Sequence, residues 1–300
     1  SGASNGTIEN NTIISLGQYG YGIYLASSSN YNKVISNNLS ESGKDGDNIV
    51  ISSSNFNNVS SNTMISSVAQ QTRGIKLTSS SNNTLDSNNI TATEWNTRGI
   101  YFGTNSNSNT ISNNNILTTL GGASYGIWFD SSNNNIIINN KINTSGGLAH
   151  GIYHASSQNN NFTNNNVTAL AAYPYYIYGT TITDYNNTIG PDNLADGKPL
   201  NYTYNYENIV FDGISSTQYG QIIFAYCNNI TIKNFNLTDN GISLYYTENS
   251  TVSNNNISIT KSYGYGVSLY YSSDSNNVTD NTITTSGGYG YGIYLFTSSN

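Results

Sequence analysis

The stretch that decides the fold covers residues 74–90 and reads Gly74-Ile75-Lys76-Leu77-Thr78-Ser79-Ser80-Ser81-Asn82-Asn83-Thr84-Leu85-Asp86-Ser87-Asn88-Asn89-Ile90. Ile75 and Leu77 stand two positions apart, so on a strand their side chains point to the same face. After a turn rich in serine and asparagine come Leu85, Asn88 and Ile90. Short apolar pairs separated by such turns are typical of β-strands.

The same pattern recurs about every 26 residues. Its first isoleucine has equivalents at Ile23, Ile49, Ile75, Ile100, Ile127, Ile152 and Ile177, and after an interruption at Ile242, Val267 and Ile293. Its asparagine recurs at Asn11, Asn37, Asn62, Asn88, Asn114, Asn140 and Asn165, and then at Asn255 and Asn281. A fixed period of this size indicates a solenoid.

The predicted fold is all-β: a right-handed parallel β-helix like that of pectate lyases, with about 26 residues and three short strands per coil. Amphipathic helical stretches and a leucine-rich consensus are both absent from the sequence. We expect the recurring asparagines to form a hydrogen-bonded ladder at one corner, where they tolerate a left-handed backbone. The glycine before each key isoleucine is expected to provide unusual dihedral angles at another corner.

We expect residues 1–300 to form a single β-helix segment cut from a longer chain. The repeat is interrupted beyond Ile177, where Pro191 and Pro199 fall. Residues 183–219 are therefore expected to be an inserted loop or irregular coil. In the coil that follows, Phe235 stands where the ladder asparagine would be.

Composition limits the function classes. Charged residues make up 8% of the chain and the net charge is −7, which argues against binding to nucleic acid. No stretch is long and apolar enough to predict a membrane span in this segment, and Cys227 is the single cysteine. Many Asn-x-Ser/Thr sequons favour an extracellular, glycosylated cell-surface protein. The candidate glycosylation positions are Asn89, Asn166, Asn236, Asn256 and Asn277.

The repeats, of the form Gly-Ile-Tyr-Leu…Ser-Ser-Asn-Asn…Asn-x-Ile, resemble those of NosD-like β-helix proteins and of related carbohydrate-binding and sugar-hydrolase proteins. More specific to that family are Asp196-Gly197-Lys198-Pro199-Leu200-Asn201-Tyr202 and Ala225-Tyr226-Cys227-Asn228-Asn229-Ile230-Thr231-Ile232. Such repeats are also common in large surface proteins of methanogenic archaea. The resemblance implies a β-helix and raises copper delivery as a function.

The residues argue against carrying the copper function over. Soft copper sites use Met, Cys and His, and this chain offers Met64, which the pattern places inward, Cys227, His150 and His154. His154 takes the inward position that Leu77 fills elsewhere. We therefore expect no metal site and no cofactor, and regard a NosD-like metal-delivery role as the least favoured function.

Polysaccharide lyases and hydrolases also use this fold, with acidic and basic clusters on one outer sheet for acid–base chemistry. The sequence offers one such candidate polar face, made of Asp47, Arg73, Lys76, Glu94 and Arg98. Sparse charges of this kind are more often a solvated surface. A polysaccharide-acting enzyme stays open as the alternative function.

The position after each key isoleucine points outward and carries aromatic residues in four successive coils. Tyr101, Trp128, Tyr153 and Tyr178 are therefore expected to form an exposed aromatic ladder. Aromatic faces suit sugar rings or a protein surface, although the rings could also simply stabilise the sheet. We predict a non-catalytic envelope or adhesive module whose partners are glycans, other cell-surface proteins or, end to end, its own copies.

Overall fold

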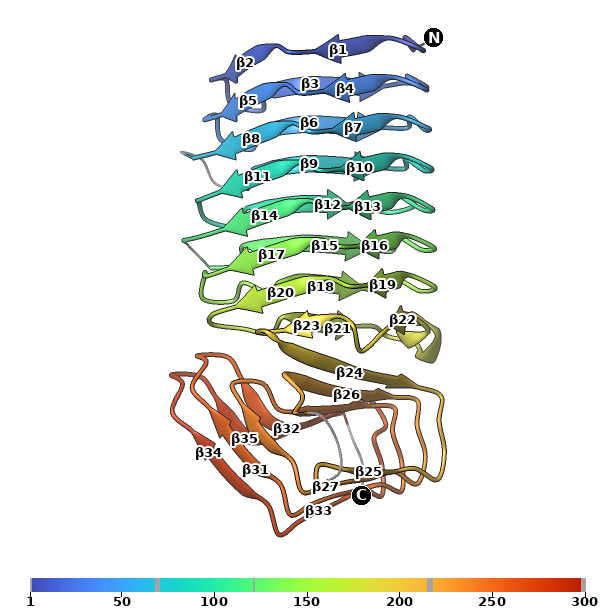
Figure 1. Ribbon diagram of the computed structural model, residues 1–300, viewed down its shortest axis with the longest axis vertical. Coiled ribbons are helices and arrows are strands. Elements are labelled where there is room, and N and C mark those ends of the chain that lie inside the picture. The colour runs from blue at the N-terminus through green and yellow to red at the C-terminus, as the bar shows by residue number, and fades with distance from the viewer. Residues whose placement is uncertain (1, 68–70, 121, 215–217, 298–300) are drawn as a thin grey trace.

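The computed structural model describes residues 2–67, 71–120, 122–214 and 218–297, and it consists of coils of short strands stacked in two groups (Figure 1). In the first group, each coil contributes one strand to each of three parallel sheets. We call this group the first stack. The predicted parallel β-helix is confirmed.

The first sheet has eight strands: β1 (Thr7–Glu9), β4 (Lys33–Ile35), β7 (Asn58–Ser60), β10 (Thr84–Asp86), β13 (Thr110–Ser112), β16 (Ile136–Ile138), β19 (Asn161–Thr163) and β22 (Thr188–Ile189). The second contains β2 (Thr12–Ser15), β5 (Asn38–Glu41), β8 (Thr63–Ser66), β11 (Asn89–Ala92), β14 (Asn115–Thr118), β17 (Lys141–Thr144), β20 (Asn166–Ala169) and β23 (Leu194–Ala195). The third, seven-stranded sheet contains β3 (Tyr21–Ala26), β6 (Asp47–Ser52), β9 (Arg73–Thr78), β12 (Arg98–Phe102), β15 (Tyr125–Asp130), β18 (Ile152–Ala155) and β21 (Tyr175–Tyr178).

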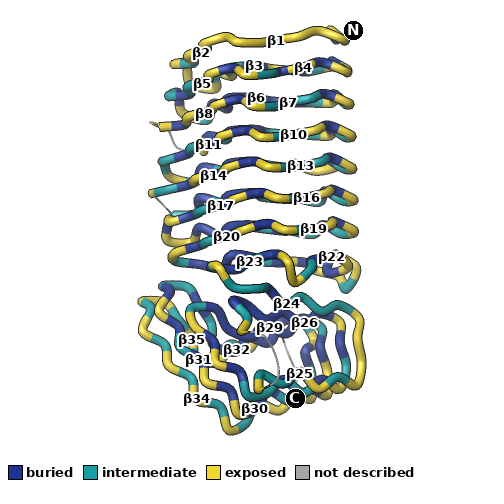
Figure 2. The backbone as a smooth tube through the Cα atoms, viewed as in Figure 1, coloured by how far each residue is buried: buried dark blue, intermediate teal, exposed yellow. Residues whose placement is uncertain are grey.

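Register follows the sequence period. Leu85 pairs with Ile111, which is 26 residues later, and Ile75 pairs with Ile100. Inward side chains such as Ile75 and Leu77 are fully buried, and buried positions alternate with exposed ones along the strands (Figure 2). The stacked isoleucines therefore form one continuous core through the first stack.

The predicted asparagine ladder is present. The Asn88 backbone N–H and Nδ2 both donate to Oδ1 of Asn114, over 2.9 and 3.0 Å. The left-handed residue at this corner is the one before the ladder asparagine, such as Ser87 with φ 54°. The ladder side chain therefore satisfies buried amides, and its neighbour makes the turn.

The glycines before the key isoleucines are needed for a different reason from the one predicted. Gly197 is the one described glycine with positive φ. At Gly126, an added Cβ would lie 2.3 Å from Cγ2 of Ile142 and 2.5 Å from the carbonyl oxygen of Gly151. Close approach of the neighbouring coil, rather than unusual dihedral angles, therefore explains glycine at this position.

The stacking direction changes after β23. Asp196 and Gly197, with φ of 51° and 80°, turn the chain into β24 (Lys198–Tyr204), which pairs antiparallel with β23. The sheet continues through β26 (Gln221–Ala225), β29 (Ile242–Tyr245), β32 (Tyr265–Tyr270) and β35 (Tyr291–Phe296). The other sheets of this second stack are β25 (Val210–Asp212), β27 (Thr231–Lys233), β30 (Thr251–Ser253) and β33 (Asn277–Thr279), and β28 (Asn236–Thr238), β31 (Asn256–Ile259) and β34 (Thr282–Thr285).

Residues 183–219, expected as an inserted loop or irregular coil, lie at this change of direction. They include most of the 3-10 helix η1 (Ile182–Tyr185) and the strands β22 to β25, while residues 215–217 lie outside the described residues. β24 and β26 lie across the lower end of the first stack (Figure 1). As predicted, Phe235 occupies the ladder position, and its backbone N–H donates to Oδ1 of Asn255 over 2.9 Å.

The second stack covers the end of the first with the outer face of its leading sheet. Ile223, Ala225, Tyr245 and Tyr270 belong to the core of the first stack, whereas Ile222 on the other face of β26 belongs to a separate second core. Across the described residues, no helix is long and apolar enough to cross a membrane.

Candidate ligand-binding face

The outer side of the seven-stranded sheet carries most of the predicted site residues, and we call it the sheet face. In β3, β6, β9, β12 and β15, the residue two positions before the key isoleucine and the residue directly after it both lie on the outer side of the sheet. The rings of Tyr21 and Tyr24, for example, lie 5.3 Å apart. Two columns of side chains result. The first contains Tyr21, Asp47, Arg73, Arg98 and Tyr125, and the second Tyr24, Val50, Lys76, Tyr101, Trp128, Tyr153 and Tyr176.

The second column is aromatic over four successive coils. Ring centroids are 5.3 Å apart between Tyr101 and Trp128, 5.3 Å between Trp128 and Tyr153, and 5.4 Å between Tyr153 and Tyr176. Tyr125 of the first column lies 5.4 Å from Trp128. These rings pack edge to face or stacked, and they are half-buried, whereas an exposed ladder was predicted. They form a rigid surface of ring edges.

The prediction for Tyr178 is wrong in register. Tyr176, not Tyr178, pairs with Tyr153, and Tyr178 pairs with Ala155. Likewise Tyr175, not Ile177, pairs with Ile152. The turn before β21 is two residues shorter than the repeat predicts. Pro174 occupies the position that Gly151 has in the preceding coil: the Pro174 carbonyl accepts from the Ile152 N–H, just as the Gly151 carbonyl accepts from the Ile127 N–H.

Three cationic side chains, those of Arg73, Lys76 and Arg98, lie next to the end of the aromatic column that begins with Tyr101. Arg73 pairs in register with Arg98, and Lys76 with Tyr101. Arg73 Nη1 lies 3.3 Å from Oδ1 of Asp47, whose side chain is fully buried. The Arg98 guanidinium lies 4.3 Å from the centroid of the Trp128 ring and 5.7 Å from that of Tyr101. Cation–π contacts therefore hold the arginines against the rings.

Burial dominates the electrostatics of this cluster. Burial, together with the neighbouring charge of Arg73, lowers the pKa of Arg98 to about 10. Burial also lowers the pKa of Lys76, with Asp47 opposing the change. The pKa of Asp47 is raised by burial, and Arg73 and Lys76 oppose that rise. Tyr101, which donates to Oδ2 of Asp130 over 3.2 Å, has a raised pKa because of burial and that carboxylate.

Glu94, the remaining residue of the predicted polar face, lies apart from these cations. No ion pair joins it to Arg73, Lys76 or Arg98 within the part of the chain that the structure describes. Its backbone carbonyl accepts from the hydroxyls of Thr97 and Ser124. The structure thus brings together Asp47, Arg73, Lys76 and Arg98, but not Glu94.

The five predicted glycosylation positions are all solvent-exposed; they are Asn89, Asn166, Asn236, Asn256 and Asn277. Each is the first residue of its strand, at β11, β20, β28, β31 and β33 respectively. An attached glycan would therefore find space at each of them.

The soft donors of the chain do not fit a copper site. Met64 is fully enclosed in the core and Cys227 is buried in the second core, where its Sγ lies 3.3 Å from the Ala225 carbonyl. His154 Nε2 lies 2.9 Å from Nδ2 of Asn160, and His150 Nδ1 accepts from the Tyr173 N–H. Among the described residues, no group of three or more His, Cys, Asp or Glu side chains could hold a metal ion.

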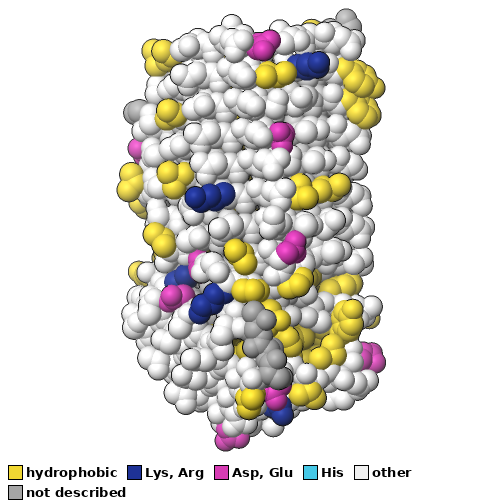
Figure 3. Space-filling model, in the orientation of Figure 1, with side chains coloured by type: hydrophobic (Ala, Val, Ile, Leu, Met, Phe, Trp, Pro, Cys, Tyr) yellow, Lys and Arg dark blue, Asp and Glu magenta, His cyan; other side chains and the backbone are white. Residues whose placement is uncertain are grey.

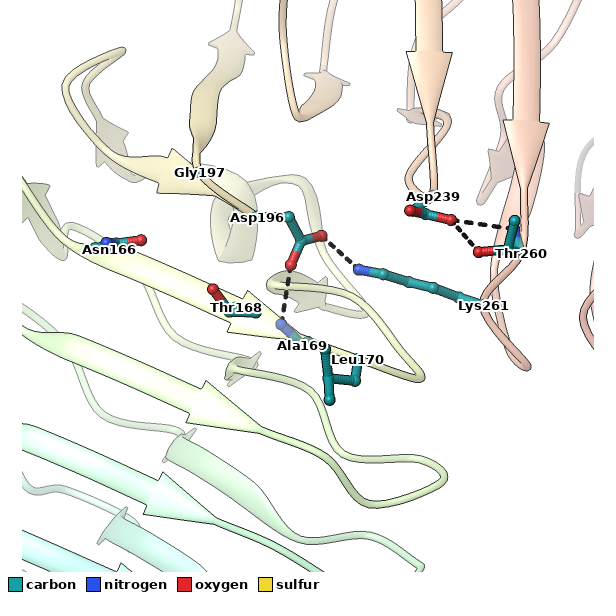
Figure 4. A pocket seen from close by; sticks show the side chains of 9 residues that line it. All are labelled: Asn166, Thr168, Ala169, Leu170, Asp196, Gly197, Asp239, Thr260 and Lys261. Carbon is teal, nitrogen blue, oxygen red and sulfur yellow. Dashed lines mark hydrogen bonds and ion pairs between the residues drawn. The ribbon is translucent and has the colours of Figure 1, made fainter.

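A separate cavity of about 500 Å³ lies where the two stacks meet (Figure 4). Oδ1 of Asp196 accepts from the Ala169 N–H over 3.1 Å, and its Oδ2 accepts from Lys261 Nζ over 2.5 Å. Asn240 Nδ2 donates to the same Oδ2 over 2.7 Å. Acidic and basic side chains lie side by side at this junction, on a surface that is otherwise largely uncharged (Figure 3).

Sequence reasoning missed this Asp196–Lys261 pair. The Asp196-Gly197 turn was a usable signal, because Asp-Gly is typical of a tight antiparallel turn. The pair is 65 residues apart in sequence, so nothing in the repeat predicts the contact. The pair fastens the Asp196 turn to both stacks.

Comparison with known families gives a match along the whole chain. A family model described as "Periplasmic copper-binding protein (NosD)" matches residues 1–119, 68–188 and 177–300. None of the curated proteins matches the sequence.

Solved structures with similar folds have low sequence identity. An alginate lyase from Paenibacillus sp. str. FPU-7 is 13% identical, with a TM-score of 0.33 and coverage of 97% of this chain and 99% of that one. The Streptococcus pneumoniae surface protein and adhesin PfbA is 10% identical, with a TM-score of 0.30 and coverage of 97% and 91%. The Agl-KA catalytic domain is 14% identical, with a TM-score of 0.26 and coverage of 96% and 62%.

Proposed function

The chain belongs to the NosD family, and from this membership and the sheet face we propose that it is a non-catalytic β-helix module that binds glycans outside the cytoplasm, at the cell surface. The family description, a periplasmic protein, supports a location outside the cytoplasm. Copper delivery is not part of the proposal, because Met64, Cys227, His150 and His154 are buried, and no group of three or more His, Cys, Asp or Glu side chains among the described residues could hold a metal ion.

The observation that carries the proposal is the aromatic column of the sheet face. Tyr101, Trp128, Tyr153 and Tyr176 follow one another at centroid distances of 5.3 to 5.4 Å. Their packing fixes each ring, so a ligand would lose little side-chain entropy from the protein on binding. A long, open surface that repeats with each coil suits an extended polymer better than a small enclosed ligand.

The surroundings of the column are polar in the way that sugar hydroxyls require. Tyr101 and Asp130 form a hydrogen bond at its edge, and the guanidinium groups of Arg73 and Arg98 lie beside the rings. Aromatic edges combined with a few placed donors and acceptors are the usual composition of ligand sites. A protein partner with a polar surface is the competing occupant.

A binding role is favoured over catalysis by the position of the acidic groups. Asp47, the carboxylate nearest the cations, is fully buried and paired with Arg73. General acid–base chemistry needs a carboxyl within hydrogen-bond reach of the substrate. The alternative, a polysaccharide lyase or hydrolase on the same face, would have to use Asp130, whose Oδ2 accepts a hydrogen bond from Tyr101 at the edge of the column.

Surface glycosylation is a further part of the proposal. The exposed asparagines at the starts of β11, β20, β28, β31 and β33 offer attachment positions. Intact-mass measurement of protein from its native source, before and after deglycosylation, tests this. An unchanged mass would remove glycosylation from the proposal without affecting the ligand-binding face.

The test of function is retention on a panel of immobilised polysaccharides, with chain length of the polymer measured in parallel. We expect retention without shortening, and the double substitution Trp128→Ser/Tyr153→Ser should weaken binding about tenfold or more, since two aromatic contacts of roughly 1 kcal/mol each are lost. The matched control is Tyr31→Ser/Phe56→Ser, which removes an exposed stacked pair 5.0 Å apart on another part of the first stack.

Each outcome separates the candidate functions. Shortened polymer would show an enzyme and overturn the non-catalytic proposal. Equal losses in the two double variants would overturn the assignment of the site to the sheet face. A folded protein that retains no polysaccharide would point to an envelope scaffold instead.

A further inference from the structure

The sheet face concentrates positive charge in a protein that is acidic overall. The chain has 9 Lys and Arg residues against 16 Asp and Glu, yet Arg73, Lys76 and Arg98 lie on the adjacent strands β9 and β12. Within the described parts of the chain, Arg73 has a carboxylate oxygen within 4.0 Å, whereas Lys76 and Arg98 have none. The cluster therefore carries two uncompensated positive charges.

The excess charge is local. Before the cluster, β6 contributes Asp47, which pairs with Arg73, and the uncharged Val50 to the two columns. After the cluster, β15 contributes the uncharged Tyr125 and Trp128. The cations are also half-buried, and Arg73 has a side-chain exposure of 18%. Placing like charges together in a partly desolvated site is unfavourable unless an anion offsets them. The lowered pKa values of Arg98 and Lys76 reflect the same repulsion and burial.

The arginines are positioned to donate hydrogen bonds to an anion. The guanidinium of Arg98 lies 4.3 Å from the Trp128 ring centroid, and that of Arg73 lies 5.4 Å from the Tyr101 ring centroid. Each guanidinium has five N–H donors. Within the described residues, the guanidinium of Arg98 makes one hydrogen bond, from Nη1 to the Asn96 carbonyl over 3.4 Å, and that of Arg73 makes one to Asp47. Fixed guanidinium groups with donors to spare are suited to carboxylate or sulfate groups.

The charges and the rings form one continuous surface. Lys76 pairs in register with Tyr101, so the column runs from an ammonium group directly onto the aromatic rings. A polymer lying along the stacking direction would therefore meet cations at β9 and β12 and ring edges from β12 to β21.

From this geometry we infer that the ligand of the sheet face is an acidic polysaccharide, whose carboxylate or sulfate groups contact Arg73, Lys76 and Arg98 while its sugar rings contact Tyr101, Trp128 and Tyr153. This inference rests on the proposed glycan-binding function and specifies its ligand class. The competing explanation is that the arginines serve only to pack against the rings.

Two matched pairs of polymers test the inference on the whole chain. Polygalacturonate is compared with its methyl ester, and dextran sulfate with dextran, so that each pair shares a backbone and differs in charge. We expect at least one charged polymer to bind about tenfold tighter than its uncharged partner. The preference should shrink as NaCl rises from about 0.05 M to about 0.5 M, because salt screens charge interactions. The two pairs also distinguish carboxylate from sulfate as the recognised group.

The protein variants are matched for charge. Lys76→Gln and Lys141→Gln make the same chemical change, but Lys141 is exposed on β17, outside the sheet face. We expect Lys76→Gln to reduce binding of the charged polymer about fivefold or more, and Lys141→Gln to leave it within about twofold. Arg98→Gln should act like Lys76→Gln, and Arg98→Lys should restore only part of the loss, since lysine lacks the planar fork.

The outcomes distinguish this inference from the proposed function beneath it. Equal binding of charged and uncharged polymers, or equal effects of Lys76→Gln and Lys141→Gln, would overturn the acidic ligand and leave glycan binding in place. Failure of all four polymers together with the neutral panel above would overturn both. Circular dichroism checks that Arg98→Gln folds. If this variant does not fold, the comparison of Lys76→Gln with Lys141→Gln alone tests the acidic ligand.

Discussion

His150 and His154 are the two histidines of the chain, and both are buried. His154 lies in the core between Phe129 and Phe162, with ring centroids 5.6 and 5.9 Å away. His150 stacks against Tyr176 at 4.4 Å. Burial lowers the pKa of each to about 3, and the charge of Lys261 adds to the effect at His150. Both are therefore neutral in the folded protein.

The buried histidines predict acid sensitivity. The unfolded chain takes up a proton at each histidine below a pKa of about 6.5, whereas the folded chain does so only near pH 3, so stability falls as pH drops between these values. At pH 5 each histidine should cost about 2 kcal/mol relative to pH 7. Urea unfolding at the two pH values, followed by tryptophan fluorescence, measures the loss.

Two substitutions isolate the histidine contribution. His154→Phe matches its neighbour Phe129, and His150→Tyr matches Tyr125, which it stacks against. Between pH 7 and pH 5, the free energy of unfolding of each variant should fall by about 2 kcal/mol less than that of the parent, which is the contribution of one histidine. A pH dependence identical to that of the parent would show that other groups control acid unfolding.

At the scale of the repeated element, the asparagine ladder provides hydrogen-bond partners for buried backbone and side-chain groups at one corner of the coils. Oδ1 of Asn88 accepts from the N–H and Nδ2 of Asn62, and its Nδ2 donates to Asn114 and to the Val59 carbonyl. Four hydrogen bonds thus depend on one side chain that is 1% exposed. Its neighbour Asn89 is exposed and accepts one bond, from Asn115.

These neighbours give a matched prediction. Asn88→Ala should lower the free energy of unfolding by about 3 kcal/mol, because it removes several hydrogen bonds and leaves buried amides without partners. Asn89→Ala should cost about 0.5 kcal/mol or less, as is usual for an exposed position. Chemical denaturation of both variants tests the difference. Similar losses at the two positions would argue against the ladder as a major source of stability.

The sequence predicted the coil well and the sheet face less well. Strand pairs, the ladder and the inward places of Met64 and His154 follow from a period that each coil repeats independently. Tyr178 was misplaced because the turn before β21 is two residues shorter, and the repeat carries no information on turn length. The rings of Trp128 and Tyr153 were expected to be exposed, but contacts with Tyr125 half-bury them. That contact crosses columns, which a strand-by-strand pattern does not describe.

At the scale of the whole molecule, the change of direction between the stacks depends on a sheet that is buried on both faces. Ile222 points into the second core and Ile223 into the first, and each is at most 1% exposed. The run Ile222-Ile223-Phe224-Ala225 lacks the usual alternation, and such runs are typical of strands with both faces covered. The sequence thus contained a signal for the junction, although not for what covers the second face.

The junction predicts that the stability of the first stack depends on the sheet that covers its end. Both tryptophans, Trp95 and Trp128, belong to the first stack, so their fluorescence reports on it alone. Ile223→Ala changes a strand of the second stack but opens a cavity in the core of the first, at a cost of about 3 kcal/mol. It should therefore lower the urea midpoint reported by the tryptophans.

Ile222→Ala is the matched comparison, because it makes the same change one residue away on the opposite face. The cavity left by Ile222→Ala lies in the second core. This variant can change the tryptophan transition only if the two stacks unfold cooperatively, so it should shift the urea midpoint less than Ile223→Ala does. If Ile223→Ala leaves the tryptophan transition unchanged, the first stack does not depend on the sheet that covers its end. Equal shifts from both variants would mean instead that the whole chain unfolds in a single transition, with the Asp196–Lys261 pair and the shared sheet joining two cores into one cooperative structure.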